Sequence, residues 1–585
     1  MKTLLLTLLF CHIATPAFAF QLSAGASIAE TPQAIRQDRR NAITGRVLTD
    51  SGQPLAQVTV TVVQAGRSGP RYSFTVATDE QGAFEFVDLP AGAFKLSVTA
   101  PGYIRITRSE EPGYHRLGES VSVTMRKGGV IAGAVRTASG EPVIGAAVRA
   151  IRIRDLDKER PLAGLRTLSR QTDDRGFYRI YGIEPGIYIV SVDAESYFPF
   201  SSSSKGANKA PTFHPSSTRD TAVEIPVRPG QEVTAVDITQ RDEPGYAVSG
   251  TVSAASSSSN IEYVTITLRD AATGSPQATL NTSMQTGGAF AVYGVPAGKY
   301  VVLARSISQT GEKDSAASQS QSITIAREDV TGLKLVLRPL GSVSGRVVLL
   351  SDRNDFQPCE PKKNPKLSEA VIALQRHVDS RGDDEIWGTF DSLGSINEEG
   401  VFSIHSLNAG QYQLSFSLPS PHWFIKSISN EAKSRPAVPL GSSTNDLVSL
   451  RLKLGPGDQL GGFVITLSDG GAIIEGRVSL ATDTQSRSRL YVDLIPTENE
   501  HPNDVVRYFQ VLVNENGDFS IRNIPPGNYR ILVRQKGNKE TSDGSALPLF
   551  WDDDGRRFLR REAATAGIPV VLRSCQRVTN YLLRY

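Results

Sequence analysis

The sequence predicts an all-β protein, a tandem array of about five antiparallel β-sandwiches that follows a signal peptide. Two short glycine motifs recur together five times, in the same order, along the chain. The segments around them alternate apolar and polar residues, which is the period of a strand with one buried face. No stretch longer than a few turns carries a helical period, so we expect strands to dominate every repeat.

The composition is that of a globular protein with many turns. Of the 585 residues, 39% are apolar and 21% are charged, and 51 glycines and 33 prolines indicate many short strands. The 63 Lys and Arg residues exceed the Asp and Glu residues by three. Such a small excess gives no overall attraction to phosphate, so we expect no nucleic-acid partner. Three Cys and three Met residues argue against a disulfide-rich scaffold or a metal–sulfur protein.

The first residues have the pattern of a secretory signal. Lys2 supplies the positive charge, residues 4–14 are apolar, and Ala17-Phe18-Ala19 fits a small-x-small cleavage site. We expect cleavage after Ala19, a secreted or periplasmic location and a linker over residues 20–42. The apolar run is too short to cross a bilayer as a helix, and we expect no membrane span later in the chain.

Fifteen glycines define the repeats and are expected to have structural roles at turns and strands. The opening motif (Ile/Val)-x-Gly-x-Val contains Gly45, Gly133, Gly250, Gly345 and Gly476. The longer motif Gly-x-aromatic-x-apolar-x-x-apolar-x-(Pro/Ala)-Gly-x-aromatic contains the pairs Gly82 and Gly92, Gly176 and Gly186, Gly288 and Gly298, Gly400 and Gly410, and Gly517 and Gly527.

The longer motif predicts a strand between two turns. An Asp or Asn three residues before the first glycine, as at Asp79, is typical of a type I turn with a left-handed glycine, which forms a bulged hairpin. The Pro-Gly or Ala-Gly pair after the strand favours a type II turn, in which the second glycine supplies the positive φ. The final aromatic, such as Tyr300, is expected to point inward.

These motifs predict five sandwiches with short linkers. We place them at residues 43–127, 128–243, 244–339, 340–470 and 471–585, and the fourth carries a polar insertion between Asp352 and Leu367. Each repeat is long enough to bury its own core. Because the linkers are short, we expect the units to follow one another like beads with limited freedom.

Repeat one resembles the carboxypeptidase regulatory-like domain. The resemblance is carried by Gly45-Arg46-Val47, by the turn at residues 50–55 and by the run from Thr78-Asp79 to Leu96, and repeat two adds Ser139–Val143. Repeats three to five keep the glycine framework without the Gly-x-Pro turn. The resemblance implies a seven-stranded, Ig-like or prealbumin-like sandwich of the carbohydrate-binding-like class, without catalysis. In secreted bacterial proteins such modules form stalks and adhesive arrays.

The sequence offers no recognisable catalytic or metal-binding motif. No histidine begins a His-x-x-Glu or His-Glu-x-x-His zinc motif, and no Gly-x-Ser-x-Gly nucleophile motif is present. We interpret Asp552-Asp553-Asp554 as a solvated loop beside Arg556 and Arg557 rather than a calcium site. We therefore expect no catalytic residue, no metal and no cofactor.

Aromatic residues in loops are the candidate ligand-binding residues. These are Trp423, Trp551, Phe213, Tyr197 and Tyr103, together with His214 beside Phe213. Planar rings stack on sugar rings, but rings that recur within a fold motif more often cap the core, which is the interpretation we favour. The sequence thus favours an exported binding or spacer scaffold at the cell envelope, with a polysaccharide or an envelope protein as partner. The alternative is a carbohydrate-binding protein that uses these loop aromatics.

Cys359 and Cys575 remain in the chain after the signal. They lie 216 residues apart in sequence, and an oxidising compartment would allow them to pair. We favour two separate buried or partly buried thiols.

Overall fold

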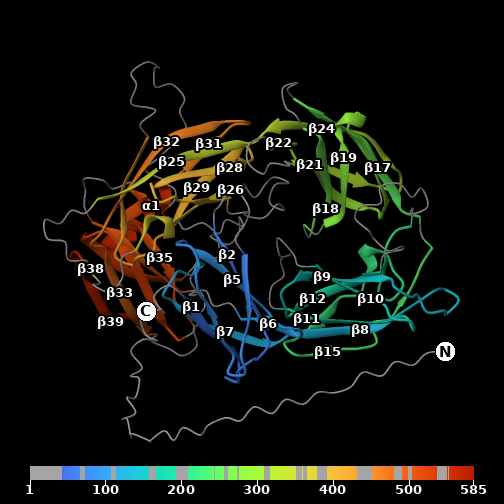
Figure 1. Cartoon of the computed structure of the whole chain (residues 1–585), viewed down its shortest axis with the longest axis horizontal. Helices are drawn as coiled ribbons and strands as arrows, with labels where there is room; N and C mark the ends of the chain where they lie inside the picture. Colours follow the sequence, from blue (N-terminus) through green and yellow to red (C-terminus); the bar gives the residue numbers. More distant parts are fainter. Residues whose placement is uncertain are drawn as a thin grey trace, which may run out of the picture.

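The computed structural model describes residues 42–65, 73–106, 113–156, 167–192, 209–242, 244–255, 261–272, 274, 276–307, 316–350, 359, 365–377, 392–430, 451–479, 490–497, 504–514, 516–535, 550 and 553–585. Nearly every described element is a strand, which confirms the all-β prediction. Figure 1 shows five successive groups of strands, called units 1 to 5 below, placed around a ring from blue to red. The predicted signal peptide and the lead-in to residue 41 lie outside the described residues.

Units 1 and 2 each contain two facing sheets. Unit 1 consists of β1 (Ile43–Thr49), β2 (Thr59–Gln64), β3 (Ser73–Ala77), β4 (Ala83–Phe86), β5 (Phe94–Thr99), β6 (Tyr103–Arg105) and β7 (Ser120–Lys127), in the orders β4-β1-β7-β6 and β3-β2-β5. Unit 2 consists of β8 (Gly129–Arg136), β9 (Ala147–Arg154), β10 (Thr167–Gln171), β11 (Phe177–Ile183), β12 (Gly186–Val192), β13 (Thr212–Phe213), η3 (Arg219–Thr221), β14 (Ile225–Val227), β15 (Glu232–Val233) and β16 (Ile238–Thr239).

Units 3 and 4 repeat the plan, and in unit 3 the strand β22 joins the two sheets. Unit 3 consists of β17 (Tyr246–Ala254), β18 (Tyr263–Asp270), β19 (Pro276–Ser283), η4 (Met284–Thr286), β20 (Ala289–Val295), β21 (Gly298–Ile307), β22 (Ala316–Ala317), β23 (Gln321–Ile325) and β24 (Val330–Pro339). Unit 4 consists of β25 (Gly341–Leu350), η5 (Leu367–Glu369), β26 (Val371–His377), β27 (Ser392–Ser395), β28 (Val401–Leu407), β29 (Gly410–Ser417), β30 (Phe424–Asn430), β31 (Arg451–Leu454) and β32 (Gln459–Ser468).

Unit 5 adds a helix to the two sheets β36-β33-β39 and β35-β34-β37-β38. It consists of β33 (Ala472–Ser479), β34 (Leu490–Pro496), η9 (Val505–Arg507), β35 (Phe509–Leu512), β36 (Asp518–Ile524), β37 (Gly527–Gln535), α1 (Asp553–Ala566), β38 (Ile568–Leu572) and β39 (Arg577–Arg584). The sequence boundaries proposed for the five sandwiches stay a prediction.

All five units share one strand arrangement. The opening strand lies between the strand of the longer motif, with which it pairs antiparallel, and the terminal strand, with which it pairs parallel. In unit 1, for example, Gly45 of β1 lies opposite Phe84 of β4 and Val121 of β7. The alternation of residues predicts strands but not the direction of their pairing, so the parallel pair is new information.

The opening glycine is required by close packing against the terminal strand. A Cβ atom at Gly45 would lie 2.2 Å from the carbonyl oxygen of Val121 and 2.5 Å from the ring of Phe84. The other four opening glycines face the same carbonyl position, and their Cβ atoms would approach it to between 2.0 and 2.2 Å. The recurrence of glycine at this position therefore follows from a steric limit and not from backbone flexibility.

The predicted turn with a left-handed glycine before the longer motif is confirmed, but it does not form the predicted hairpin, because β3 pairs with β2 and β4 pairs with β1 in a different sheet. Gly82 has φ of +70°, and the Asp79 Oδ1 atom accepts hydrogen bonds from the amides of Gln81 and Ala83 at 2.9 and 2.7 Å. The carbonyl of Gly82 then accepts from the amide of Val47, at 2.8 Å, and the same bond recurs in every unit at 2.7–2.8 Å. This turn therefore connects the two sheets and fixes the start of β4 onto the opening strand.

The predicted type II turn is wrong. Gly92 and Gly186 do not have positive φ, and the equivalent glycines of units 3 to 5 have φ of 153–159° instead of the roughly +80° that a type II turn needs. A neighbouring side chain occupies the space that a Cβ would fill: the Arg152 Nε atom would lie 2.5 Å from a Cβ at Gly186. Arg152 donates to the Pro185 carbonyl at 2.6 Å, and Arg376 donates to the equivalent carbonyl in unit 4 at 2.9 Å.

The inward aromatic of the longer motif has a second role that the sequence did not predict. In units 2 to 5 this residue is a buried tyrosine whose hydroxyl donates to the carbonyl four residues upstream, at 2.7–2.9 Å: Tyr188, Tyr300, Tyr412 and Tyr529. In unit 1 the position is the fully buried Phe94. Because the hydroxyl satisfies a loop carbonyl from inside the core, it ties the loop before the strand to the core.

Helix α1 corrects the prediction of a loop at Asp553 and Asp554, whose side chains are exposed as predicted, and Asp552 lies outside the described residues. Gly555, Arg556, Leu559 and Ala563 are buried, which is the spacing of a helix face that packs on a sheet. The carboxylates of Asp553 and Asp554 at the helix N-terminus pair with Arg556 and Arg557. The helical period was present but weak, because charged side chains surround only two apolar residues on that face.

The largest cluster of buried apolar side chains crosses from unit 4 into unit 5. It contains the core of unit 4, including Trp423 and Phe463, and continues to Tyr508 and to Leu559 and Ala563 of α1. Units 1, 2 and 3 each have a separate cluster, and unit 5 has a second cluster between its sheets. Units 4 and 5 are therefore packed together through apolar contacts rather than joined only by a linker.

A first prediction concerns the opening glycine. Gly45→Ala should destabilise unit 1 by about 1–3 kcal/mol or more, because the added methyl group overlaps the Val121 carbonyl and the Phe84 ring. Hydrogen exchange read by mass spectrometry should show faster exchange across β1, β4 and β7. The matched control is Gly113→Ala, whose methyl group meets no atom within 4 Å. Equal exchange in the two variants would contradict the steric explanation.

A second prediction concerns the buried tyrosines. Tyr300→Phe leaves the Pro296 carbonyl without its 2.9 Å hydrogen bond and should cost unit 3 about 1–3 kcal/mol at neutral pH. Burial raises the pKa of Tyr300 to about 12, against an opposing effect of Arg219. Because the pKa of Tyr300 is higher in the folded than in the unfolded state, its contribution to folding stability is fully present below the unfolded pKa of about 10. This contribution is lost as the pH rises from about 10 to about 12.

Calorimetry at about pH 8 and about pH 11 checks this prediction. Between these two pH values, the transition temperature for unfolding of unit 3 should fall further in the native chain than in the Tyr300→Phe variant. Tyr263→Phe, at a 45% exposed position of the same unit, is the control and should match the native chain at both values. Identical alkaline losses in all three proteins would show that the Tyr300 hydroxyl does not contribute.

Candidate functional site

Contacts between units, rather than residues within one unit, create the main candidate site. Neighbouring units 2 and 3 are joined by an ion pair between Arg219 and Asp270, and Arg305 of unit 3 donates to the Ser406 carbonyl of unit 4 at 3.3 Å. The bead-like prediction is wrong in one respect, because unit 1 also contacts unit 4. Figure 1 shows β2 and β5 of unit 1 beside β26 of unit 4. The array is therefore closed on itself.

Arg116 makes the polar part of the contact between units 1 and 4. It is 8% exposed, and it donates from Nε to the Glu369 carbonyl at 3.0 Å and from Nη2 to the carbonyl and hydroxyl of Ser417 at 3.2 and 3.0 Å. Burial lowers the pKa of the Arg116 guanidinium, while the carboxylates of Glu119 and Glu369 oppose this effect. The apolar part of the contact is a small cluster of Ala65, Ala93 and Val371.

A cleft of about 880 Å³ lies where units 1, 4 and 5 meet. Unit 1 contributes residues 115, 116 and 118–122, unit 4 contributes residues 416–423 from the end of β29 to the start of β30, and unit 5 contributes residues of its three-stranded sheet. On the unit 5 wall, Glu475 binds Arg577 through both carboxylate oxygens at 2.9–3.2 Å and lies 3.7 Å from Arg522. Two guanidinium groups therefore share one carboxylate, which leaves this wall positively charged.

The cleft also contains polar atoms with unused hydrogen-bonding capacity. His115 is 4% exposed, and its Nδ1 atom has Glu119 at 3.5 Å but no hydrogen bond in the described part of the chain. The Oδ1 atom of Asp469 is buried and likewise has no described partner. A buried polar atom without a partner costs free energy unless something polar meets it. The arrangement therefore suits a polar ligand.

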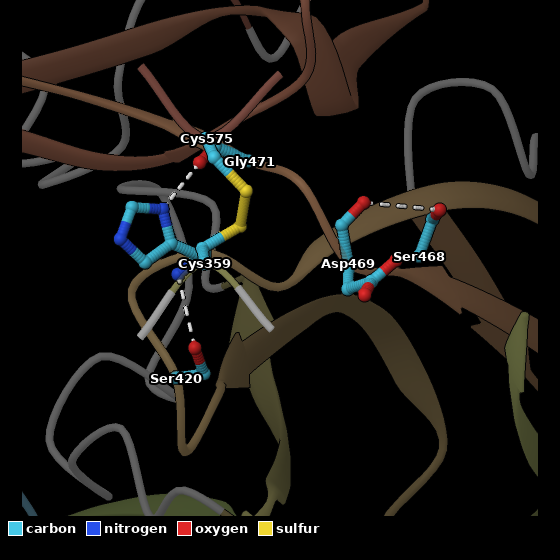
Figure 2. Close-up of a disulfide and its surroundings, with 7 residues drawn as sticks. Cys359, Ser420, Ser468, Asp469, Gly471 and Cys575 are labelled. Atoms are coloured by element: carbon cyan, nitrogen blue, oxygen red, sulfur yellow. Dashed lines mark hydrogen bonds between the residues drawn. A yellow bond between two sulfur atoms is a disulfide. The ribbon is translucent and has the colours of Figure 1, made fainter. Parts of the chain in front are cut away.

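A disulfide joins units 4 and 5 at the edge of this cleft, and it corrects the expectation of two separate thiols. Cys359 of the unit 4 insertion is bonded to Cys575, in the turn before β39, with 5.3 Å between their Cα atoms. Figure 2 shows this bond beside the residues 468–471 that link the two units. The separation of 216 residues hid the pairing, because only the packing of unit 5 on unit 4 brings the two cysteines together.

Further hydrogen bonds fix the same junction. The Gly471 amide donates to the His422 carbonyl at 2.6 Å, and the His422 Nδ1 atom lies 2.6 Å from the Gly471 carbonyl oxygen. Asn523 of unit 5 donates to the carbonyls of Ser420 and Trp423 at 2.7 and 2.6 Å. The loop that forms the unit 4 wall of the cleft is therefore held by unit 5.

The predicted aromatic residues do not form one site. Trp423 is 5% exposed and belongs to the unit 4 core, and Phe213 is 2% exposed within unit 2. His214 is half-buried, with Nδ1 2.6 Å from the Asp237 carbonyl oxygen. Tyr197 and Trp551 lie outside the described residues. Trp423 and Phe213 thus occupy the core positions that the favoured interpretation gave them, although Trp423 also lines the cleft of units 1, 4 and 5.

A second, shallower groove of about 480 Å³ lies between units 1 and 2. Tyr103 of unit 1 and Tyr181 of unit 2 line it, together with Lys127 and the pair Arg179 and Glu232. Sequence analysis identified Tyr103 but missed Tyr181. The sequence could have indicated Tyr181, because this residue lies two positions after Arg179 and therefore on the same outward face of β11.

Comparisons with known proteins support the family resemblance for unit 1 alone. Residues 42–126 match the family model of the carboxypeptidase regulatory-like domain. The match does not extend to the other repeats, so five copies of this family stay a prediction. No curated protein matches the chain.

Several solved structures are similar to parts of the chain. The TIE protein of Bacillus anthracis is 12% identical, with 73% of each chain covered and a TM-score of 0.14. GBS52, the minor pilin of Streptococcus agalactiae, is 13% identical over 34% of this chain and 96% of its own, with a TM-score of 0.18. BcpA, the major pilin subunit of Bacillus cereus, is 11% identical over 59% of this chain and all of its own, with a TM-score of 0.13. No argument about function rests on similarities this low.

Neither a metal-binding group of side chains nor a membrane-spanning helix is found among the described residues. No group of three or more His, Cys, Asp or Glu side chains in the described ranges is arranged to hold a metal ion. No helix in the described part of the chain is long and apolar enough to cross a membrane.

A third prediction tests the contact that closes the array. Arg116→Ala removes three hydrogen bonds to unit 4 and should raise hydrogen exchange in residues 365–377 and 410–417, while the core strands of unit 1 stay protected. Arg46→Ala, on an exposed position of β1, is the matched control and should leave unit 4 unchanged. If both variants exchange like the native chain in unit 4, Arg116 does not hold the two units together.

Proposed function

We propose that this chain is an exported, non-catalytic scaffold that presents a fixed binding cleft at the cell envelope or outside the cell. One observation carries the proposal: unit 1 and the consecutive units 4 and 5, which are far from unit 1 in sequence, wall the same cleft, and specific contacts hold each wall. Arg116 holds unit 1 against unit 4, and the Cys359–Cys575 disulfide holds unit 4 against unit 5. A preformed site binds without the cost of first ordering its walls.

Two features support export. The first nineteen residues have the pattern of a secretory signal. Disulfides form and persist in oxidising compartments such as the bacterial periplasm or the exterior of the cell. A disulfide between two units of the array fits the same location.

A fourth prediction follows from the disulfide. In the chain isolated from its native compartment, peptide mapping without reductant should recover the peptides of Cys359 and Cys575 as one cross-linked species. Reduction, or Cys359→Ser, should increase hydrogen exchange in the loop 416–423 and in residues 468–479, because the junction loses its covalent bond. Recovery of both residues as free thiols from freshly isolated protein would contradict both the pairing and the proposed location.

The binding role is tested by partner capture. The immobilised chain should retain a polysaccharide or protein from envelope extracts, and Arg522→Glu should abolish this, because it places a negative charge on the cleft wall. The matched control is Arg477→Glu, on the same sheet but outside the cleft and 63% exposed at its side chain. Capture that is lost equally in both variants, or in neither, would contradict the cleft as the binding site.

Carbohydrate binding is the second candidate function. The buried rings of Trp423 and Phe213 do not favour it. The groove that contains Tyr103 and Tyr181 does favour it, at a place separate from the cleft.

A further inference from the structure

The groove between units 1 and 2 has the properties of a built binding site. It is formed where β6 and the end of β7 in unit 1 meet β11 and the start of β15 in unit 2. It therefore lies outside the cleft of units 1, 4 and 5, and what it binds rests on carbohydrate binding, the second candidate function.

Three glycines make the two walls of the groove rigid relative to each other. The amide of Gly128 donates to the Gly102 carbonyl at 2.9 Å. A Cβ at Gly128 would lie 2.6 Å from the Cα atom of Gly182, and a Cβ at Gly182 would lie 3.6 Å from Gly102. Such close backbone contact permits little movement between Tyr103, which follows Gly102, and Tyr181, which precedes Gly182.

The two tyrosines are placed by their neighbours. Tyr103 lies opposite Lys127 in the register of β6 and β7. The Arg170 guanidinium lies 4.8 Å from the centre of the Tyr181 ring, a cation–π contact that holds the ring in one position. Both residues are half-buried and line the groove. They offer apolar ring surface next to polar hydroxyl groups, which is the combination that a sugar ring requires.

The charged residues that line the groove are Lys127, Arg179 and Glu232. Arg179 binds Glu232 through two parallel hydrogen bonds of 3.0 and 3.1 Å, and this pairing lowers the pKa of Glu232. That carboxylate therefore stays ionised and can accept hydrogen bonds from ligand hydroxyls. Lys127 is exposed, and no carboxylate in the described ranges lies within ion-pair distance of its ammonium group. The groove thus has one cation in excess.

We propose that this groove binds a chain of acidic sugars. A uronate-type ring would pack on Tyr103 and Tyr181, its carboxylate would pair with Lys127, and its hydroxyls would donate to Glu232. An uncharged polysaccharide would leave Lys127 without a partner, and an acidic peptide would lack the ring that the tyrosines accommodate.

The test measures binding of the purified chain to polygalacturonate by titration calorimetry. Dextran serves as the uncharged polysaccharide and poly-L-glutamate as the non-sugar polyanion. We expect saturable binding of polygalacturonate only. It should weaken as salt rises from about 0.1 M to about 1 M, which shortens the Debye length from about 10 Å to about 3 Å.

Variants assign the binding to the groove. Tyr103→Ala with Tyr181→Ala, and separately Lys127→Glu, should each weaken binding roughly tenfold or more. Tyr103→Phe with Tyr181→Phe keeps both rings and should retain most of the affinity, which guards against a simple loss of folding. The matched controls are Tyr263→Ala, at an exposed ring of unit 3, and Lys334→Glu, on the exposed face of β24.

Several outcomes would overturn the inference. These are no binding of polygalacturonate, equal binding of poly-L-glutamate or dextran, or affinities that do not change in the tyrosine and lysine variants. The cleft variant Arg522→Glu should bind polygalacturonate like the native chain, so failure of the groove and failure of the scaffold proposal give different results.

Discussion

The arrangement of this molecule depends on the contact that Arg116 makes between the first and the fourth unit. Its guanidinium is buried between them and donates to two carbonyls and a hydroxyl of unit 4. A buried guanidinium needs such acceptors, because desolvation would otherwise be costly. The contact turns a chain of short linkers into a closed array, and without it units 1 and 5 would not share the walls of one cleft. The contact of units 1 and 4, to which Arg116 and the cluster of Ala65, Ala93 and Val371 contribute, thus supports both the closed arrangement and the candidate site.

Both candidate sites lie between units. Within a unit the notable residues have structural explanations: the glycines relieve steric contact or permit turns, the inward tyrosines tie loops to the core, and Trp423 fills the interior of unit 4. The cleft arises from units 1, 4 and 5 and the groove from units 1 and 2. Function in such an array therefore comes from how its units meet, and the disulfide between Cys359 and Cys575 strengthens one of these junctions.

The sequence predicted what local chemistry determines. The turn at Asp79 and Gly82 and the strand after it follow from side chains a few residues apart, and the structure confirms them. The sequence could not show the parallel pairing of opening and terminal strands, because alternation is the same in either direction. It also missed the Cys359–Cys575 pairing and the contact of Arg116 with Ser417, which join residues that only the packing of whole units brings together. Helix α1 was missed because its apolar face has only Leu559 and Ala563.

The closed arrangement is tested most directly by small-angle X-ray scattering of the purified chain in solution. The account predicts a compact distribution of interatomic distances that fits the closed array, with units 1 and 4 in contact as in Figure 1. Arg116→Ala should extend the distribution to longer distances. A native profile that already fits an extended string of units, unchanged by the substitution, would contradict the account.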